Sequence, residues 1–449
     1  MTRWPPGALL GAVSQGLDSA ILPVMDALKL PGRDCLRVEG GAPLRGAVQV
    51  SGAKNAALPA MAAALLTQDE CLLENVPAID DVTVMAEILR RLGADVQPAG
   101  PGRWVVRGDS VRETVAPSEL VVHLRASFLV MGALLARYGE AACAAPGGDV
   151  VGQRPLDVHL GGFRALGAEI SRRGDKFYAR ARRLRGARVF LDYPSVMGTE
   201  NVMLAASLAE GTTQIINAAA EPEIVFLADM LNAMGGRVRG AGTHTIEIEG
   251  VPALHGAAVR VIPDRLEAGT FAIAAAATRG AVDILGAVPR HLDALIYKMR
   301  EMGVEIVEHD AGLSVRGKPR YRATSVQAVP YPGLATDLQA QVATLLTQAE
   351  GVSFVHERVF DNRLMYVGEL RKFGAEVVST GSTVVINGPT PLVGATARAL
   401  DIRAGAALII AGLAAEGTST ITDIYHLDRG YEALETKLRG LGARVARVP

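Results

Sequence analysis

One short phrase recurs six times along the chain, and this repeat limits the possible folds more than any other feature. Leu92-Gly93-Ala94-Asp95-Val96 returns with small changes at 166–170, 234–238, 302–306, 373–377 and 441–445. The first glycines stand at positions 93, 167, 235, 303, 374 and 442, which by subtraction lie 74, 68, 68, 71 and 68 residues apart. Such even spacing indicates six copies of one structural unit, from about residue 40 to the end.

The first unit shows the order of elements. Its residue pattern predicts a strand, a helix, a strand, a helix and two strands, at 48–50, 55–67, 71–76, 82–92, near 96 and at 104–106. Gly93 follows the second helix and is expected to end it, because glycine readily takes the left-handed conformation there. Hydrophobic residues make up 49% of the chain but aromatics only 4%, so small aliphatic side chains must pack the cores of an α/β protein.

Charged residues occupy the point in each unit where the first strand meets the first helix. The six junctions hold Lys54, Arg125, the segment 195–199, Arg265, Asp337 and Arg403. Four of these are cations, and cations at helix N-termini are unfavourable unless an anion is bound there. If the six N-termini converge, they form an anion site that contains one carboxylate; if they do not, these are ordinary solvated side chains.

A glycine-rich segment at 146–155 brings further chemistry. It carries Asp149 and Arg154 among three glycines, with Asp157 and His159 just beyond it. Glycine at this density predicts a loop. Asp and Gly are also common in plain turns, so the residues alone leave open whether Asp149 is a turn former or a functional acid.

Charge and cysteine content exclude several classes of protein. The 46 basic and 47 acidic residues nearly cancel, which argues against a partner that is nucleic acid or a membrane surface. Cys35, Cys71 and Cys143 lack metal-ligand spacing, so we expect reduced thiols, no metal site and a cytoplasmic location. Residues 1–35 match neither a signal peptide nor a membrane span and are treated as an N-terminal extension of unknown role.

Four phrases of the sequence resemble one family. They are Ser51–Pro59, Pro146–Gly148 followed by Gly152–Pro155, Leu208–Thr213 and Tyr425–Glu432. Together they resemble the UDP-N-acetylglucosamine 1-carboxyvinyltransferases, an enolpyruvyl transferase family, over residues 36–449. The shikimate-pathway enolpyruvyl transferase is similar in its six-unit plan, but the Lys-Asn and Gly-Gln-Arg-Pro phrases are typical of the sugar-nucleotide branch.

The resemblance implies a fold and a domain division. The fold would be α/β: a two-domain inside-out α/β barrel of six β-α-β-α-β-β repeats, with three repeats in each domain. The first domain would be discontinuous, with residues 36–53 and 263–449. The second would span 54–262 and carry the 146–155 loop, and the active site would lie between the two.

The resemblance also implies a reaction, the transfer of the enolpyruvyl group of phosphoenolpyruvate to the 3'-hydroxyl of UDP-N-acetylglucosamine with release of phosphate. This first committed step of peptidoglycan synthesis needs an acid to protonate C3, a base for the hydroxyl and cations for the anionic substrate. Asp149 stands where most of the family has a Cys as the acid, so its pKa must be raised for this role. The change from Cys implies insensitivity to fosfomycin. Asp337 is the expected base.

Further site residues are carried over by their positions. Phosphoenolpyruvate is expected to contact Lys54, Arg154 and Arg429, with Arg125 and Arg403 adding to the field; Asp401 is expected near the reacting carbons and Asn55 at the substrates. The nucleotide sugar is expected to contact Arg154, Pro155, Leu156, Asp157, Val158, Tyr193, Pro194, Ser195, Val196 and the backbone of Val359. Neither a cofactor nor a metal is implied.

Three departures from the family pattern concern the acceptor side. Met197 stands in a loop where the family has a glycine, Asp361 replaces a Glu and Ala220 replaces an Arg. They favour, as a second hypothesis, a paralogous enolpyruvyl transferase that uses another nucleotide or hydroxyl acceptor. A third hypothesis is a ligand-binding relative without catalytic activity. It is disfavoured because every charged position of the expected site is occupied.

Overall fold

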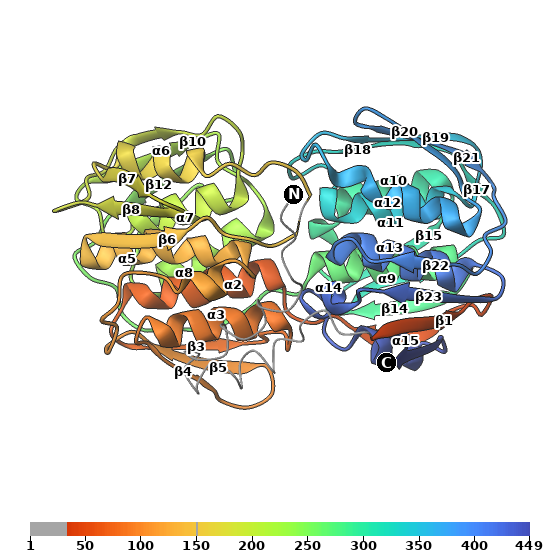
Figure 1. Cartoon of the computed structure of the whole chain (residues 1–449), viewed down its shortest axis with the longest axis horizontal. Helices are drawn as coiled ribbons and strands as arrows, with labels where there is room; N and C mark the ends of the chain where they lie inside the picture. Colours follow the sequence, from red (N-terminus) through yellow and green to blue (C-terminus); the bar gives the residue numbers. More distant parts are fainter. Residues whose placement is uncertain (1–33, 150) are drawn as a thin grey trace, which may run out of the picture.

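The computed structural model describes residues 34–149 and 151–449, and it forms two lobes that lie side by side (Figure 1). The extension expected over 1–35 therefore falls outside the described residues except for its last two. Buried apolar side chains form two separate sets. One set runs from Ala53 to Val261, and the other joins Leu36–Val50 to Leu266–Val445. We refer to these parts as the first and the second lobe.

Three sheets enclose the first lobe. In the order in which their strands pair, they are β13 (Ala258–Arg260), β3 (Glu70–Glu74), β5 (Arg103–Arg107) and β4 (Asp95–Pro98); β6 (Glu140–Ala144), β8 (Lys176–Arg180) and β7 (Glu169–Arg173); and β11 (Val238–Arg239), β12 (Thr245–Glu249), β10 (Thr212–Ile216) and β9 (Arg188–Phe190). The last strand of the lobe, β13, runs parallel to β3, the first. The chain thus returns to its starting sheet before it leaves the lobe.

Three more sheets form the second lobe. They are β22 (Thr396–Arg398), β23 (Thr418–Thr422), β1 (Cys35–Glu39) and β24 (Arg444–Val448); β15 (Glu305–His309), β16 (Gly312–Arg316), β14 (Ala281–Leu285) and β2 (Arg45–Gln49); and β17 (Tyr321–Arg322), β19 (Ala349–Glu357), β21 (Thr383–Gly388) and β20 (Glu376–Thr380), with β18 (Ser325–Ala328) on β19. In Figure 1, β1 lies in red among the blue strands of the C-terminal part. The two N-terminal strands, β1 and β2, therefore pair with strands that come much later in the chain.

One helix of each unit is almost wholly buried. These are α2 (Lys54–Ala63), α5 (Val130–Tyr138) and α7 (Val196–Ala206) in the first lobe, and α9 (Arg265–Ala277), α11 (Thr336–Leu346) and α13 (Ile402–Ala414) in the second. Their Ala- and Gly-rich sequences permit close approach: a Cβ on Gly132 would stand 2.4 Å from the carbonyl oxygen of Asn201. Small side chains therefore let these helices fill the interior with few aromatic rings.

The second helix of each unit is amphipathic. These helices are α3 (Asp80–Arg91), α6 (Asp157–Ala165), α8 (Pro222–Ala233), α10 (Asp293–Met302), α12 (Tyr366–Leu370) and α15 (Leu434–Gly440); two short ones, α4 (Ser118–Val121) and α14 (Tyr425–Asp428), lie outside this pattern. All six repeat glycines follow such a helix with φ between +85° and +99°. The predicted helix-ending role of the repeat glycine is confirmed, and so is the six-unit α/β fold.

The chain crosses between the lobes twice, and the two crossings run together. Gly52 and Pro263 form an antiparallel bridge. Ala53 donates its N–H to the carbonyl of Ile262, and Asp264 donates to that of Ser51, both over 2.8 Å. Helices α2 and α9 start directly after these crossings, so their N-termini lie at the boundary of the lobes.

Candidate active site

A cavity of about 530 Å³ opens between the lobes, and all six strand-to-helix junctions line it. Lys54, Arg125 and the Ser195 segment come from the first lobe, and Arg265, Asp337 and Arg403 from the second. Helix N-termini present unpaired N–H groups and partial positive charge. Their convergence, inferred above only as a possibility, gives the cavity the character of an anion site.

Two of the expected cations share one buried acid. Lys54 Nζ lies 2.7 Å from Asp81 Oδ2, and Arg429 Nε lies 2.9 Å from Asp81 Oδ1. Asp81 is only 2% exposed and sits in the first turn of α3. Asp81 could not be singled out from the sequence, since acids in the first turn of a helix are common. Asp81 holds a cation from each lobe, which fixes both beside the cavity.

The glycine-rich loop spans the gap between the lobes. Asn362 of the second lobe donates its N–H to the carbonyl of Val151 over 3.3 Å. Gly152 has a φ of +130°, and a Cβ there would stand 3.1 Å from the backbone nitrogen of Asp361. Glycine is therefore required at this contact both for its conformation and for its lack of a side chain. The loop closes over the cavity and carries Asp149 and Arg154 into it.

Asp149 faces cations rather than the apolar surroundings that its expected role requires. Its Oδ1 accepts a hydrogen bond from Arg429 Nη1, and His426 Nδ1 lies 3.3 Å away. Burial alone would raise its pKa, but His426, Arg429 and Lys54 outweigh burial and hold the pKa of Asp149 well below its usual range. With only the protein's own charges around it, Asp149 is ionised. The protein's own residues therefore do not give Asp149 the raised pKa that its expected role as an acid requires.

Asp337, the expected base, sits between two buried guanidiniums. Arg363 Nη2 lies 3.0 Å from its Oδ1 and Arg403 Nε 3.1 Å from its Oδ2. Burial opposes ionisation, yet the two cations lower the pKa of Asp337 to about 2. The carboxylate is therefore ionised at neutral pH, while the two cations lower its affinity for a proton. Arg363 was not anticipated from the sequence, because its separation from Asp337 gives no periodic signal.

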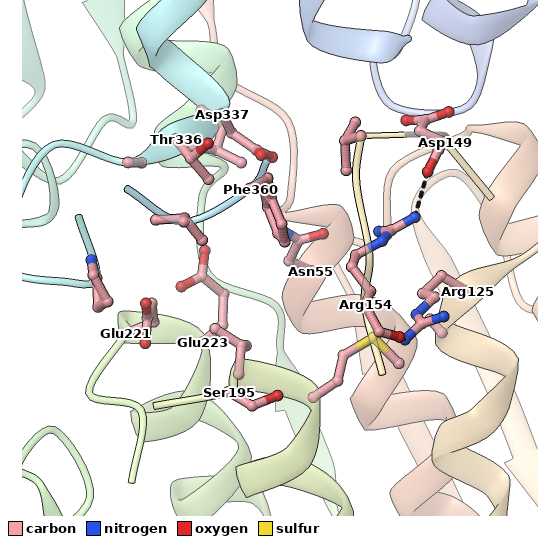
Figure 2. Close-up of a pocket in the computed structure, with 18 of the residues that line it drawn as sticks. Asn55, Arg125, Asp149, Arg154, Ser195, Glu221, Glu223, Thr336, Asp337 and Phe360 are labelled. Carbon is pink, nitrogen blue, oxygen red and sulfur yellow. Dashed lines mark hydrogen bonds between the residues drawn. The ribbon is translucent and has the colours of Figure 1, made fainter. Parts of the chain in front are cut away.

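Arg125 and Arg154 lie next to each other on the loop side of the cavity (Figure 2). Arg154 donates to the carbonyl of Asp149, and its guanidinium lies 6.0 Å from the ring centre of Phe360. Arg125 donates in turn to the carbonyl of Arg154. Burial and the neighbouring Arg154 lower the pKa of Arg125 to about 10, which leaves it charged at neutral pH. Two adjacent cations held by carbonyls keep their charge available for an anion.

The residues expected at the nucleotide sugar divide into two groups. Asn55, Arg154, Pro155, Tyr193, Pro194, Ser195, Val196 and Val359 line the cavity, whereas Leu156, Asp157 and Val158 do not. Ser195 caps α7, with its Oγ accepting the N–H of Gly198 over 3.1 Å. Because the next residues continue along α6, only the first part of the 154–158 segment faces the cavity.

The three departures from the family pattern also lie in different places. Met197 lines the cavity as the second residue of α7, with a helical backbone and no positive φ. Met197 therefore lies at the start of a helix rather than in a loop, and its position requires no glycine. Asp361 and Ala220 do not line the cavity. Of the three departures, Met197 alone lines this cavity.

Asp401 does not line the cavity either. Its Oδ1 accepts the N–H groups of Arg403, over 2.7 Å, and Ala404, over 2.9 Å, as the N-cap of α13. Such a cap satisfies two otherwise unpaired donors at the helix start. Asp401 thus caps α13 and positions Arg403.

Fold and site together define a two-lobed α/β enzyme with an anion-binding cavity between its lobes. A family model for EPSP synthase (3-phosphoshikimate 1-carboxyvinyltransferase) matches residues 38–438. The UDP-N-acetylglucosamine 1-carboxyvinyltransferase 1 of Caldanaerobacter subterraneus is 49% identical over 410 residues, 91% of this chain and 98% of that protein. That of Finegoldia magna is 46% identical over 418 residues, 92% of this chain and 99% of that protein. The chain belongs to the enolpyruvyl transferase family.

Solved structures agree with this assignment. The enolpyruvyl transferase NikO from Streptomyces tendae superposes with a TM-score of 0.84 at 27% identity, covering 93% of this chain and 99% of that one. EPSP synthase from Acinetobacter baumannii gives a TM-score of 0.73 at 18% identity, over 93% of this chain and 100% of that one. At this lower identity the second likeness concerns the fold alone.

Proposed function

We propose that the protein transfers the enolpyruvyl group of phosphoenolpyruvate to the 3'-hydroxyl of UDP-N-acetylglucosamine and releases phosphate, as a cytoplasmic step of peptidoglycan synthesis. The observation that carries this proposal is the sequence identity of almost half, over more than nine tenths of the chain, to proteins named for that reaction. The cavity supports it independently, because cations from both lobes meet Asp149 and Asp337 there.

Proton transfer divides the reaction into two steps. Asp149 gives a proton to C3 of phosphoenolpyruvate, and C2 becomes electrophilic. The acceptor oxygen then forms a bond to C2 while its proton passes to Asp337. In the second step the methyl group at C3 gives one of its three protons back to the Asp149 carboxylate, the double bond reforms and the C2–O bond to phosphate breaks, while the proton on Asp337 passes to the leaving phosphate. The products are the enolpyruvyl ether and inorganic phosphate, so no cofactor is needed to balance the reaction.

The cations explain how Asp149 can act as an acid although its pKa is low without substrate. His426 holds the carboxylate ionised by a hydrogen bond, and Arg429 and Lys54 do so by their charge. Phosphoenolpyruvate brings a phosphate and a carboxylate to the same two side chains. Their charge offsets the cations, so burial then dominates and raises the pKa of Asp149. Binding of one substrate would thus create the acid.

Cations from both lobes are placed to bind the anionic groups of the substrates. Lys54, Arg125 and Arg154 come from the first lobe and Arg429 and Arg403 from the second. Guanidiniums bind phosphate and carboxylate groups in a bidentate manner, which orients as well as attracts. A substrate that is bound by side chains of both lobes draws the lobes together, and closure of the cavity keeps water from the reactive intermediate.

One observation favours a second candidate, a paralogous transferase with another nucleotide or hydroxyl acceptor. Met197 lines the cavity beside Ser195, where an acceptor phosphate is expected. Its side chain narrows that part of the cavity and could select a different group. The phosphoenolpyruvate side would be unchanged in such a paralogue.

The test is turnover by the purified protein with phosphoenolpyruvate and UDP-N-acetylglucosamine, followed by phosphate release and by mass detection of the product. We expect enolpyruvyl-UDP-N-acetylglucosamine at the same rate with and without fosfomycin. UMP and UDP serve as alternative acceptors in parallel reactions. Phosphate release with one of these, and none with the nucleotide sugar, would establish the second candidate instead.

A further inference from the structure

Three carboxyl groups line the cavity on the side away from Arg125 and Arg154, and none of them was anticipated from the sequence. Glu200 lies on α7, and Glu221 and Glu223 lie at the start of α8. Figure 2 shows Glu221 and Glu223 across the cavity from the two arginines. We call these three residues the acidic wall. The cavity therefore has a cationic side and an acidic side.

The acidic wall contains buried oxygens without partners. Glu200 is 2% exposed and its Oε1 accepts or donates no hydrogen bond within the described residues. Glu221 is 8% exposed, and its Oε2 is likewise unpartnered there, while its Oε1 lies 3.4 Å from the N–H of Tyr331. A buried polar atom without a partner is unfavourable for folding. Two such atoms at the edge of one cavity are suited to a ligand that completes their hydrogen bonds.

The carboxylate of Glu223, the third member of the acidic wall, already has a hydrogen-bond partner. Glu223 accepts from Arg265 Nε at 3.0 and 3.3 Å, and this pair joins the lobes. Arg265 is the only cation that the described residues place in a salt bridge with the wall. One guanidinium cannot neutralise three carboxylates. Glu223 and Arg265 hold the wall in place, and the unsatisfied hydrogen-bonding capacity belongs to Glu200 and Glu221.

Burial and mutual repulsion decide how these two groups are charged. Burial, with the nearby Glu223 and Glu221, raises the pKa of Glu200 well above its usual range. Burial also raises the pKa of Glu221, although Arg265 opposes the change. Burial therefore favours the protonated form of Glu200. It can donate one hydrogen bond and accept another, and Glu221 offers an accepting oxygen beside it.

The geometry points to the acidic wall as a subsite for the uncharged, hydroxyl-bearing end of the acceptor, the pyranose ring of the nucleotide sugar. This inference rests on the proposed function and adds residues to it. A phosphate would be repelled by Glu221 and Glu223. Hydroxyl groups both donate and accept, which matches one neutral acid beside one accepting carboxyl. A ligand with phosphates at one end and a sugar at the other fits both sides of the cavity.

The backbone around Glu221 makes this residue a suitable place for a test. Glu221 occupies the N-cap position of α8, but its side chain makes no capping hydrogen bond. Replacing it should therefore leave the helix intact. Asp229, on the exposed face of the same helix and outside the cavity, provides a matched control.

The experiment compares Glu221→Ala, Glu200→Leu, Glu200→Gln and Asp229→Asn with the wild type. We expect Glu221→Ala and Glu200→Leu to raise the KM for UDP-N-acetylglucosamine by about tenfold, the usual effect of a lost hydrogen bond to a buried group. The KM for phosphoenolpyruvate should stay the same. Glu200→Gln keeps an uncharged donor and should resemble the wild type, as should Asp229→Asn.

Calorimetric binding of UDP, which lacks the sugar, separates the subsite from a general loss of structure. UDP should bind Glu221→Ala and the wild type equally, because only a sugar reaches the wall. Equal weakening of UDP and UDP-N-acetylglucosamine would overturn the inference, and so would an unchanged acceptor KM in both Glu221→Ala and Glu200→Leu. Wild-type protein that fails to turn over this acceptor would refute the proposed function, and the subsite with it.

Discussion

Replacing Asp337 by Asn tests how the two buried guanidiniums are held. The side chain is 25% exposed, whereas those of Arg363 and Arg403 are only 7% and 4% exposed. The fall in the pKa of Asp337 from the ordinary 3.8 to about 2 means that the folded protein stabilises the ionised form of this side chain relative to its protonated form. That difference amounts to about 2 kcal/mol. The Asn variant also leaves two cations facing each other, so we expect a total loss of about 2 to 4 kcal/mol in the free energy of unfolding.

The measurement is urea denaturation of both proteins at pH 7.5 and at pH 5. Because the folded pKa of Asp337 lies below the unfolded one, its stabilisation is complete above the unfolded value and is lost as pH falls through the folded value. The difference between wild type and variant should therefore be the same at pH 5 and pH 7.5. Turnover should also fall, by about 10²-fold or more, since the base is gone.

Asp423→Asn is the matched control for this experiment. Asp423 is also 25% exposed, but its partner Arg398 is 63% exposed. An ion pair in water contributes at most about 1 kcal/mol, so this variant should be nearly as stable as the wild type. If Asp337→Asn lowered the free energy of unfolding no more than the control does, that result would refute the argument that the buried Arg363 and Arg403 require a negative charge between them.

Three further predictions concern the other acids of the site. Asp149→Ala should lower turnover by about 10³-fold or more while calorimetry shows unchanged binding of UDP-N-acetylglucosamine; wild-type turnover would remove Asp149 from the acid role. Asp149→Cys should become sensitive to fosfomycin and gain the mass of one inhibitor molecule, whereas the wild type should not; an unmodified Cys variant would contradict the placement of residue 149. Asp81→Asn should bind inorganic phosphate more tightly, by about tenfold, because Asp81 competes with anions for Lys54 and Arg429; weaker binding would mean that Asp81 chiefly orients them.

The junction residues were predictable because the repeat fixes their register. Once the phrase around Gly93 defined six units, Lys54, Asp337 and Arg403 fell at the starts of α2, α11 and α13. Arg125 fell at the start of the 3-10 turn that leads into α5. Helix N-termini point their N–H groups at one place when units are arranged around a common cavity. The repeat glycines were predictable for a similar reason, since a helix ends most easily where a residue accepts a positive φ.

Partners that depend on the meeting of distant segments were not predictable. Asp81 and Arg429 are 348 positions apart, and neither carries a local signal of the other. The same holds for Asp337 with Arg363 and for the acidic wall, whose members look like ordinary helix residues until the lobes are placed together. The low pKa of Asp149 could not be foreseen either, because it depends on which cations surround the carboxylate in three dimensions.

The origin of the proton that reaches C3 tests the central claim most directly. With phosphoenolpyruvate and UDP-N-acetylglucosamine in deuterium oxide, the carboxyl proton of Asp149 exchanges with solvent, so the acid delivers deuterium. The account predicts that the enolpyruvyl methylene of the product carries deuterium by mass spectrometry. A product that forms without deuterium, or no product at all, would contradict it.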